Sequence, residues 1–90
     1  MIPDLRRFRA FVVLAEELHY GRAAERLKMC QSPLSRLITG LERDIGIALF
    51  ARTHHRVALT AAGRSMLHDA RRIIAHVDTA LRRAHENHDL

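Results

Sequence analysis

Apolar side chains recur every three or four positions near the start of the chain. This spacing predicts an amphipathic helix over about residues 4–18, opened by a Pro-Asp pair. Tyr20 and Gly21 are expected to end this helix. A short second helix is predicted over residues 22–28, where two alanines would let another helix approach closely.

The clearest apolar stripe follows a tight turn at residues 29–31. It predicts a third helix that starts near Ser32 and stops at Gly46, a residue suited to a helix C-terminus. The apolar residues trace one face of this helix: Leu34, Leu37, Ile38, Leu41 and Ile45.

The opposite face of this third helix carries short hydroxyl side chains and arginines, and residues 32–40 contain no acid. Two short helices joined by a tight turn form a helix-turn-helix, placed here at about residues 20–39, whose second helix enters DNA. The alternative is a helical hairpin with a solvated outer face, on which Glu, Lys and Gln would be expected. The candidate DNA-facing residues are Ser32, Ser35, Arg36 and Thr39.

Two brief apolar stretches at residues 47–50 and 57–59 flank a basic segment, which predicts a β-hairpin wing at about residues 49–59. A hairpin this short is marginal alone, so we expect its apolar residues to pack on the helices. The tip holds two Arg and two His and no acid. This bias favours contact with a phosphate backbone over a plain solvated loop.

Thr60 is a good N-cap, and no residue interrupts the helical pattern between it and His88. A helix over this segment would be roughly 42 Å long. A helix of that length cannot bury its whole stripe on a small core, so we expect a second copy of the chain to cover it. The alternative is that it docks onto a further domain. The expected dimer seam follows heptad spacing: Met66, Ala70, Ile73, Val77, Ala80 and Ala84, widened by Ile74 and Leu81.

Composition narrows the class of protein. Ninety residues, 48% of them hydrophobic, fit one domain or a fragment of a longer protein. No apolar run approaches the ~20 residues that cross a bilayer, and the start of the chain does not look like a signal peptide. A single cysteine, Cys30, precludes an intramolecular disulfide and fits a reducing cytosol. We therefore expect a cytoplasmic protein without a membrane partner.

The net charge of +5 is concentrated in the middle of the chain. Residues 20–56 carry seven basic residues against three acidic ones, whereas the segments on either side are close to neutral. Charge alone leaves two interpretations open, an anionic partner such as nucleic acid or an arginine-rich protein that is merely soluble.

Six short motifs, in order and at the right spacing, resemble the N-terminal domain of LysR-type transcriptional regulators. They are Ala23-Ala24-Glu25-Arg26-Leu27, Gln31-Ser32-Pro33-Leu34-Ser35-Arg36, Leu41-Glu42 with Gly46, Leu49-Phe50, Arg52, and Leu59-Thr60-Ala61-Ala62-Gly63. The resemblance implies a mainly α fold, with a winged helix-turn-helix of three helices and a two-stranded β wing over residues 1–59. A long linker helix for dimerisation over residues 60–90 would follow, with a C-terminal effector-binding domain outside this chain.

The resemblance also implies a function. Family members bind double-stranded DNA at two-fold operators in bacterial promoters, as homodimers and usually as tetramers at full length. A small-molecule coinducer is expected only for the missing domain, so we expect no cofactor here. Carried over by position, the DNA-facing set is Gln31, Ser32, Pro33, Ser35 and Arg36 on the recognition helix, with Arg52, His54, His55 and Arg56 on the wing.

Two positions depart from the family pattern. Cys30 stands where Ser or Thr usually caps the recognition helix, a change that removes on the order of 1 kcal/mol unless Ser32 takes over the cap. His55 stands where the wing often has Arg, which leaves open which side chain enters the minor groove.

Three other functions are less well supported by the sequence. An enzyme is disfavoured because none of the seven His has a Cys or carboxylate partner at zinc spacing, and no phosphate loop or nucleophile motif appears. A helical protein-interaction module would explain the heptads but not the acid-free face. A redox sensor at Cys30 lacks a partner thiol.

Overall fold

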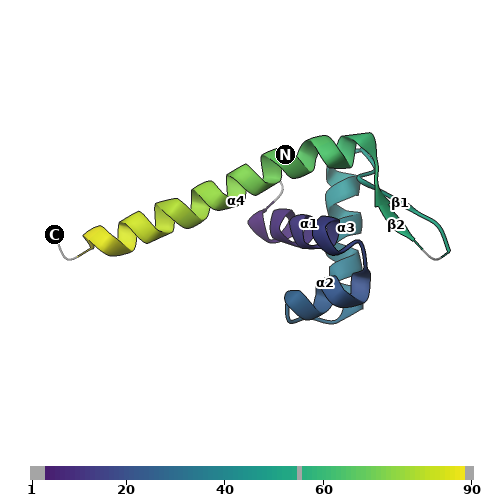
Figure 1. Cartoon of the computed structure of the whole chain (residues 1–90), viewed down its shortest axis with the longest axis horizontal. Helices are drawn as coiled ribbons and strands as arrows, with labels where there is room; N and C mark the ends of the chain where they lie inside the picture. Colours follow the sequence, from purple (N-terminus) through teal and green to yellow (C-terminus); the bar gives the residue numbers. More distant parts are fainter. Residues whose placement is uncertain (1–3, 55, 89–90) are drawn as a thin grey trace.

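The computed structural model describes residues 4–54 and 56–88, and over these residues it contains four helices and one two-stranded antiparallel sheet. Helices α1, α2 and α3 gather into a head, from which α4 runs out as a rod and the β-hairpin projects on the other side (Figure 1). The predicted winged helix-turn-helix fold is therefore confirmed. The elements are α1 (Leu5–Glu17), α2 (Tyr20–Arg26), α3 (Gln31–Ile45), β1 (Phe50–Arg52), β2 (Val57–Leu59) and α4 (Ala61–Asn87).

The break between α1 and α2 lies earlier than the sequence predicts. Asp4 caps α1 by accepting a hydrogen bond from the backbone N–H of Arg7, and Leu18 ends the helix in the left-handed conformation at φ 50°. His19 then caps α2, because its Nδ1 accepts the Arg22 N–H at 3.0 Å. The prediction that Tyr20 and Gly21 end the first helix is wrong, since both lie within the first turn of α2.

The third helix, α3, begins and ends almost where expected. It starts at Gln31, one residue before the predicted start, and Gly46 closes it in the left-handed conformation with φ 73°. Cys30 occupies the N-cap without any side-chain hydrogen bond to the helix. The possible takeover of the cap by Ser32 does not occur, because Ser32 is already inside the helix.

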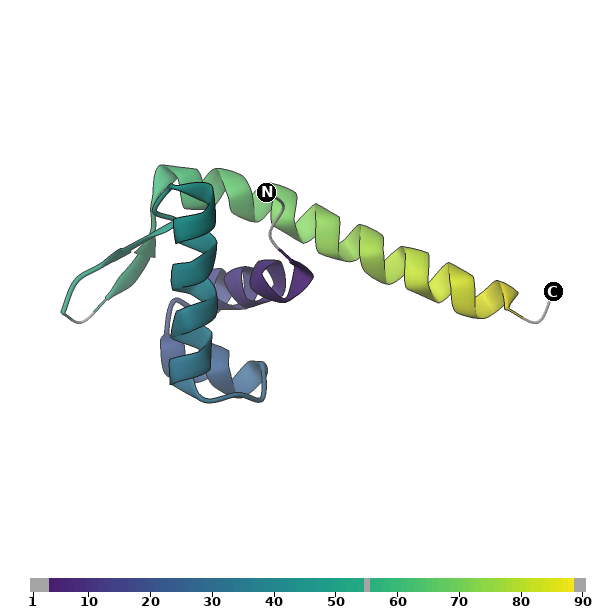
Figure 2. The same ribbon diagram turned by 180° about the vertical axis from the view of Figure 1, so that it is seen from behind.

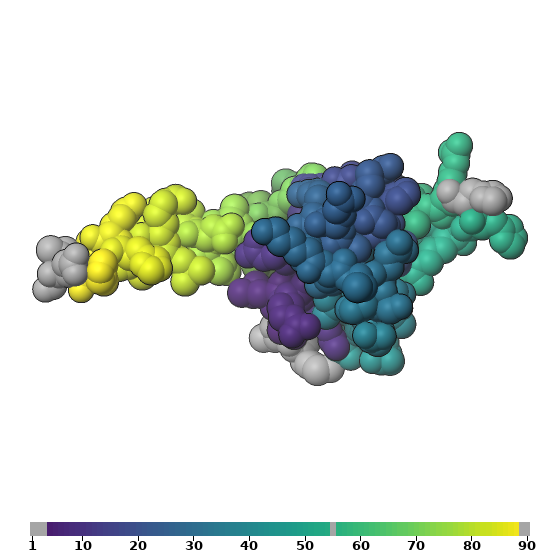
Figure 3. Space-filling view, turned by 90° about the horizontal axis from the view of Figure 1, so that it is seen from below, coloured from purple at the N-terminus to yellow at the C-terminus, as the bar shows by residue number. Residues whose placement is uncertain are grey.

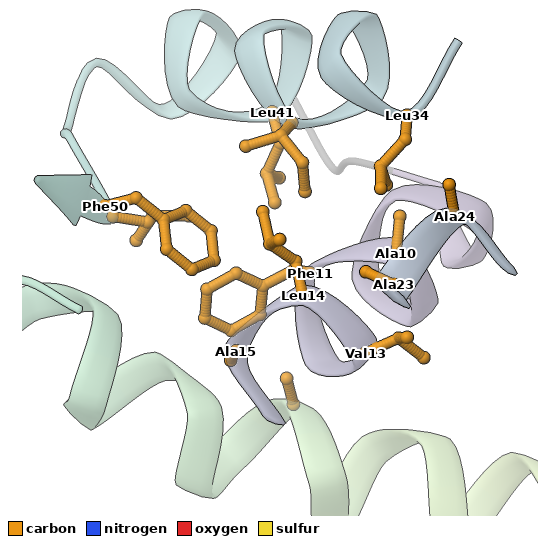
Figure 4. Packing of buried hydrophobic residues seen from close by; sticks show 13 residues of the cluster. Ala10, Phe11, Val13, Leu14, Ala15, Ala23, Ala24, Leu34, Leu41 and Phe50 are labelled. Carbon is orange, nitrogen blue, oxygen red and sulfur yellow. The ribbon is translucent and has the colours of Figure 1, made fainter. Parts of the chain in front are cut away.

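The core forms where α1 crosses α3 and meets the wing. The Phe11 and Phe50 rings lie with centroids 5.5 Å apart at an interplanar angle of 58°, one of the tilted arrangements aromatic pairs favour (Figure 4). Val57 and Leu59 of β2 pack against this core as expected. The fully buried large side chains are Phe11, Leu14, Leu34, Ile38, Leu41 and Leu49.

The residues that α4 contributes to the core lie in its first half. Thr60 caps it by accepting the Gly63 N–H at 3.0 Å, as predicted, and also donates to the Ala48 carbonyl at 2.8 Å. Ala70 is fully buried against the chain's own core. The expected dimer seam is therefore corrected at Ala70, because a side chain enclosed within one copy has no surface to offer a second.

The rest of the expected seam divides into two groups. Met66 is half-buried against the core, and Ile74 and Val77 are also half-buried. The seam residues that remain exposed are Ile73, Ala80, Leu81 and Ala84. In the described part of the chain no helix is both long and apolar enough to span a membrane.

Candidate nucleic-acid interface

The two faces of α3 differ as the sequence predicts. Leu34, Ile38 and Leu41 are fully buried, while the opposite face is open to solvent (Figure 2). Pro33 is half-buried at the edge of that face. The exposed polar side chains, here named the reading face, are Gln31, Ser32, Ser35, Arg36 and Thr39.

The reading face carries no negative charge of its own. No ion pair involves Arg36 among the residues that the structure describes, although the chain holds several arginine–carboxylate pairs elsewhere. A guanidinium held on a helix surface without a carboxylate partner keeps its donors available for an external acceptor. The geometry therefore presents hydrogen-bonding groups and positive charge outward from one helix.

The wing is a short antiparallel hairpin whose register pairs Phe50 with Leu59 and Arg52 with Val57. His54 and Arg56 are exposed at its tip. His55, also predicted to contact DNA, lies outside the described residues. The tip projects beyond the head, on the side of the molecule away from the far end of α4 (Figure 1).

Arg52 is engaged within the chain rather than directed to the wing tip. Its Nη2 donates to Glu42 Oε1 at 3.5 Å, and its guanidinium carbon lies 5.6 Å from the centre of the Tyr20 ring. The Arg52 side chain nevertheless remains 42% exposed. These contacts join β1 to both helices of the helix-turn-helix, so Arg52 helps fix the wing relative to α3.

Glu42 and Tyr20 are the contributors to this arrangement that sequence reasoning missed. Glu42 Oε2 accepts the backbone N–H groups of Leu49 at 2.8 Å and Phe50 at 3.2 Å, just where β1 begins. Burial raises the pKa of Tyr20, although the nearby Arg52 charge acts in the opposite direction. The Leu41-Glu42 motif was a signal for Glu42, but its target amides could be found only from the fold.

Ion pairs fix α4 on the head. Glu16 of α1 accepts from Arg71 of α4 at 3.1 Å and from Arg26 of α2 at 3.0 Å. Arg9 and Asp78 form a second, longer pair at 3.6 Å between α1 and α4. The two ion pairs between α1 and α4 thus lie about two helical turns apart along α4.

The described residues contain no group of three or more His, Cys, Asp or Glu side chains arranged to hold a metal ion. Their one cysteine, Cys30, is exposed and free. The chemistry that the surface offers is therefore hydrogen bonding and positive charge.

Comparison with known sequences places this surface in a family. Residues 5–64 match the family described as "Bacterial regulatory helix-turn-helix protein, lysR family". The chain is 53% identical over 85 residues to the uncharacterized HTH-type transcriptional regulator YnfL of Escherichia coli strain K12, covering 94% of this chain and 29% of that protein. It is 52% identical over 75 residues to the HTH-type transcriptional regulator IlvR of Caulobacter vibrioides, covering 83% of this chain and 25% of that protein. The chain thus spans less than a third of either relative.

Comparison with solved structures agrees with the family match found from the sequence. The crystal structure of the CbnR_DBD–DNA complex superposes with a TM-score of 0.87 at 36% identity, covering 92% of this chain and 95% of that one. The BenM_DBD/catB site 1 DNA complex superposes with a TM-score of 0.89 at 34% identity, covering 92% of each. With an acid-free helix face, a basic wing and a match over residues 5–64, the chain belongs to the LysR family of bacterial transcriptional regulators and constitutes its helix-turn-helix DNA-binding domain.

Proposed function

We propose that the chain binds operator DNA as a homodimer, with the reading face of α3 in the major groove of each half-site. The observation that carries this proposal is the exposed, acid-free reading face on the outer side of a helix whose inner side is fully buried. The similarity to DNA-binding domains solved in complex with DNA supports DNA as the partner. A rigid helix with only one free face can enter a groove in only one rotational setting.

The side chains of the reading face suit base edges. Gln31 can donate to and accept from adenine, and Arg36 can donate two parallel hydrogen bonds to guanine O6 and N7. Ser32 and Ser35 are short enough for direct or water-bridged contacts, and the Pro33 ring can meet a thymine methyl group. Each good bidentate contact contributes about 1–3 kcal/mol of discrimination between bases.

The wing would contact the flanking backbone or the minor groove. His54 and Arg56 are the described tip residues positioned for this role. Arg52 would act chiefly by holding the wing, because its guanidinium already contacts Glu42 and Tyr20. Any contact of Arg52 with DNA would use the exposed part of its side chain.

Dimerisation would occur through α4. The exposed Ile73 and Leu81 side chains lie on a helix that, in the part of the chain that the structure describes, contributes no residue beyond Ala70 to the core. Covering them with a second α4 would remove apolar surface from water and place two reading faces about one helical turn of DNA apart, ~34 Å. The division into a DNA-binding unit over residues 1–59 and a linker helix over 60–90 belongs to this proposal.

The chain would act by binding, without catalytic turnover or a cofactor of its own. In the full-length protein, a further domain would bind a small-molecule coinducer, and dimers would pair into tetramers. A cytoplasmic location fits a regulator that must reach bacterial promoters. Each of these statements is a proposal, supported by the family to which the chain belongs.

Selection of bound sequences from a random duplex pool tests the proposal directly. We expect two half-sites in inverted orientation, with centres separated by about one helical turn. Arg36→Ala should weaken binding to the selected site by about 1–3 kcal/mol and change random-sequence binding little. A pool without enriched sequences would contradict specific recognition, and equal losses on both DNAs would show that Arg36 contacts only phosphate.

A further inference from the structure

A cleft of about 370 Å³ lies beside the reading face, between the first turn of α1 and one flank of α3. Its lining residues are four arginines and three apolar residues. The arginines are Arg6, Arg7, Arg36 and Arg43, and the apolar residues are Met29, Pro33 and Leu37. We name this feature the arginine cleft.

Only one of the four arginines is neutralised. Arg7 forms an ion pair with Asp44, and both side chains are partly buried. Arg6, Arg36 and Arg43 are exposed, and no ion pair involves them in residues 4–54 and 56–88. Three positive charges that line one cleft, none of them paired with a carboxylate, repel one another, so an anion bound in the cleft would be favoured.

Arg7 is the one arginine of the cleft whose guanidinium is held in place by other residues of the chain. Its guanidinium crosses α3 at Gly40, where an added Cβ would lie 2.9 Å from Arg7 Nη2. The absence of a side chain at Gly40 therefore lets Arg7 lie against the helix backbone and reach Asp44. Arg7 is thus held by Asp44, whereas the other three guanidinium groups form no ion pair within the described residues.

The cleft and the wing flank α3 on opposite sides. The start of α1 lies on one side of α3 and the β-hairpin on the other in both ribbon views (Figures 1 and 2). Viewed from below, atoms from the start of α1 lie beside those of α3, on the face where α3 is exposed (Figure 3). Arg36 belongs to both surfaces, since it lies on the reading face and also lines the cleft.

We propose that the arginine cleft holds a DNA backbone phosphate at the edge of the major groove opposite the wing. An α-helix with its side chains is about 10–12 Å wide and the major groove is about 12 Å wide, so a helix in the groove has a phosphate ridge along each flank. The wing would meet one ridge, and Arg6 and Arg43 would meet the other. This inference rests on the proposed function, because it requires α3 to lie in the groove.

Phosphate is the ligand that the chemistry of the cleft fits. Guanidinium groups donate paired, charge-assisted hydrogen bonds to phosphate oxygens, and several can share one phosphate. The three apolar lining residues offer no side-chain donor to a base edge, and with α3 in the groove its flank would be turned away from the groove floor. Arg6 and Arg43 should therefore contribute affinity for any duplex without contributing sequence preference.

The test measures the salt dependence of binding for the 90-residue chain on two labelled duplexes, the selected operator and a random sequence. The double variant Arg6→Ala/Arg43→Ala should lower the slope of log K against log salt by about 0.9, the value for one phosphate, and each single variant should lower it by part of that amount, equally on both duplexes. Affinity at low salt should fall about three- to tenfold for each single variant. Arg6→Lys and Arg43→Lys should restore the slope, since lysine also binds phosphate as a point charge.

Arg82→Ala is the matched control. It removes one exposed arginine near the far end of α4, and its slope should equal that of the wild-type chain. Unchanged slopes for Arg6→Ala and Arg43→Ala, or losses confined to the selected operator, would overturn the proposal. A second outcome would also overturn it. If the arginine variants bound duplex DNA as the wild type does but no longer bound inorganic phosphate, the cleft would be a site for a free anion.

The two levels of the proposal fail separately. In the first case, selection from the random pool yields no consensus sequence, but the salt slopes still fall in the arginine variants. This result contradicts sequence-specific recognition and supports the phosphate site in the cleft. A clear consensus with unchanged slopes removes the cleft and supports the proposed function. Circular dichroism of each variant confirms that the fold is intact, so a loss of binding reports on the contact itself.

Discussion

The Glu42 carboxylate accepts the backbone N–H of Leu49 at 2.8 Å, so the last turns of the recognition helix hold the chain where it enters the wing. The same oxygen accepts the Phe50 N–H, and the other oxygen receives Arg52. The position of the wing is thus tied to the helix that would lie in the groove. A change at Glu42 should be felt at both parts of the DNA-binding surface.

Glu42→Ala is expected to lower the free energy of unfolding by about 1–3 kcal/mol. Leu49 is buried, and removing the carboxylate leaves its N–H without an acceptor. Glu42→Gln retains one carbonyl oxygen and should lose less. Urea denaturation measures the change, with Glu25→Ala as control, because Glu25 is exposed on α2 and forms no ion pair within the described residues. Equal stability of the two alanine variants would contradict the anchoring role.

Gly63→Ala should destabilise the fold, although the same change at an open helix position stabilises by about 0.5–1 kcal/mol. A Cβ on Gly63 would clash with the Leu49 carbonyl oxygen and lie 2.9 Å from Leu59 Cδ2, so α4 would have to move away from the wing. We expect a loss of about 1–3 kcal/mol, typical of overpacking. Thermal denaturation beside the exposed Ser65→Ala control measures it, and a gain in stability would show that the contact relaxes freely.

The buried and exposed faces of α3 could be predicted because its apolar residues lie along a single face of the helix. Leu34, Ile38 and Leu41 at helical spacing fix which side is buried, and the opposite side then has to face solvent. Gly46 marks the end because a left-handed C-cap favours glycine. These features depend on neighbours in sequence, so the sequence contains them.

The missed features depend on distant contacts. Nothing near Glu42 in sequence reveals that it caps the amides of a strand seven and eight residues later. Ala70 fits the heptad seam, but α4 packs against α1, and Ala70 is buried in the core of the same chain. The arginine cleft likewise joins residues of α1 and α3 that share no local motif. Such pairings arise only when the helices are packed.

Cys30→Ser is expected to stabilise the chain by about 0.5–1 kcal/mol. Cys30 occupies the N-cap of α3 without a side-chain hydrogen bond, and a serine hydroxyl there can accept an unpaired N–H of the first turn. Cys30→Ala is the control, because it removes the thiol without supplying an acceptor. Denaturation midpoints measured under reducing conditions compare the three proteins. Equal midpoints for the serine and alanine variants would show that the first-turn amides gain nothing from a cap.

Stability should fall in acid partly through Glu16. Partial burial alone would raise the pKa of Glu16, but hydrogen bonds and positive charge from Arg26 and Arg71 lower it below its ordinary value of 4.5. A carboxylate with a lowered pKa stabilises the fold above the unfolded value, and this contribution is lost as pH falls through the folded value. The difference between wild type and Glu16→Gln should therefore be present at neutral pH and decline as the pH falls below 4.5, the ordinary value of this carboxyl.

The Glu16 contribution should be small, a few tenths of a kcal/mol, because these ion pairs are solvent-exposed. Urea denaturation across the acid range measures it. Glu86→Gln provides the control, since Glu86 is exposed on α4 and forms no ion pair in the part of the chain that the structure describes. If the stability difference between wild type and Glu16→Gln stayed constant with pH, the effect of the substitution would come from packing and not from the charge of Glu16.

Ile73→Asp and Leu81→Asp should convert a dimer into a monomer without unfolding the head. These two side chains are 41% and 58% exposed in one copy, so replacing them leaves the core intact but would place charges in an apolar seam between two α4 helices. Ala75→Asp puts the same charge on the opposite side of α4 and should leave the dimer unchanged. Sedimentation velocity distinguishes the states. A wild-type chain that sediments as a monomer, or variants that remain dimeric, would place the self-association surface elsewhere.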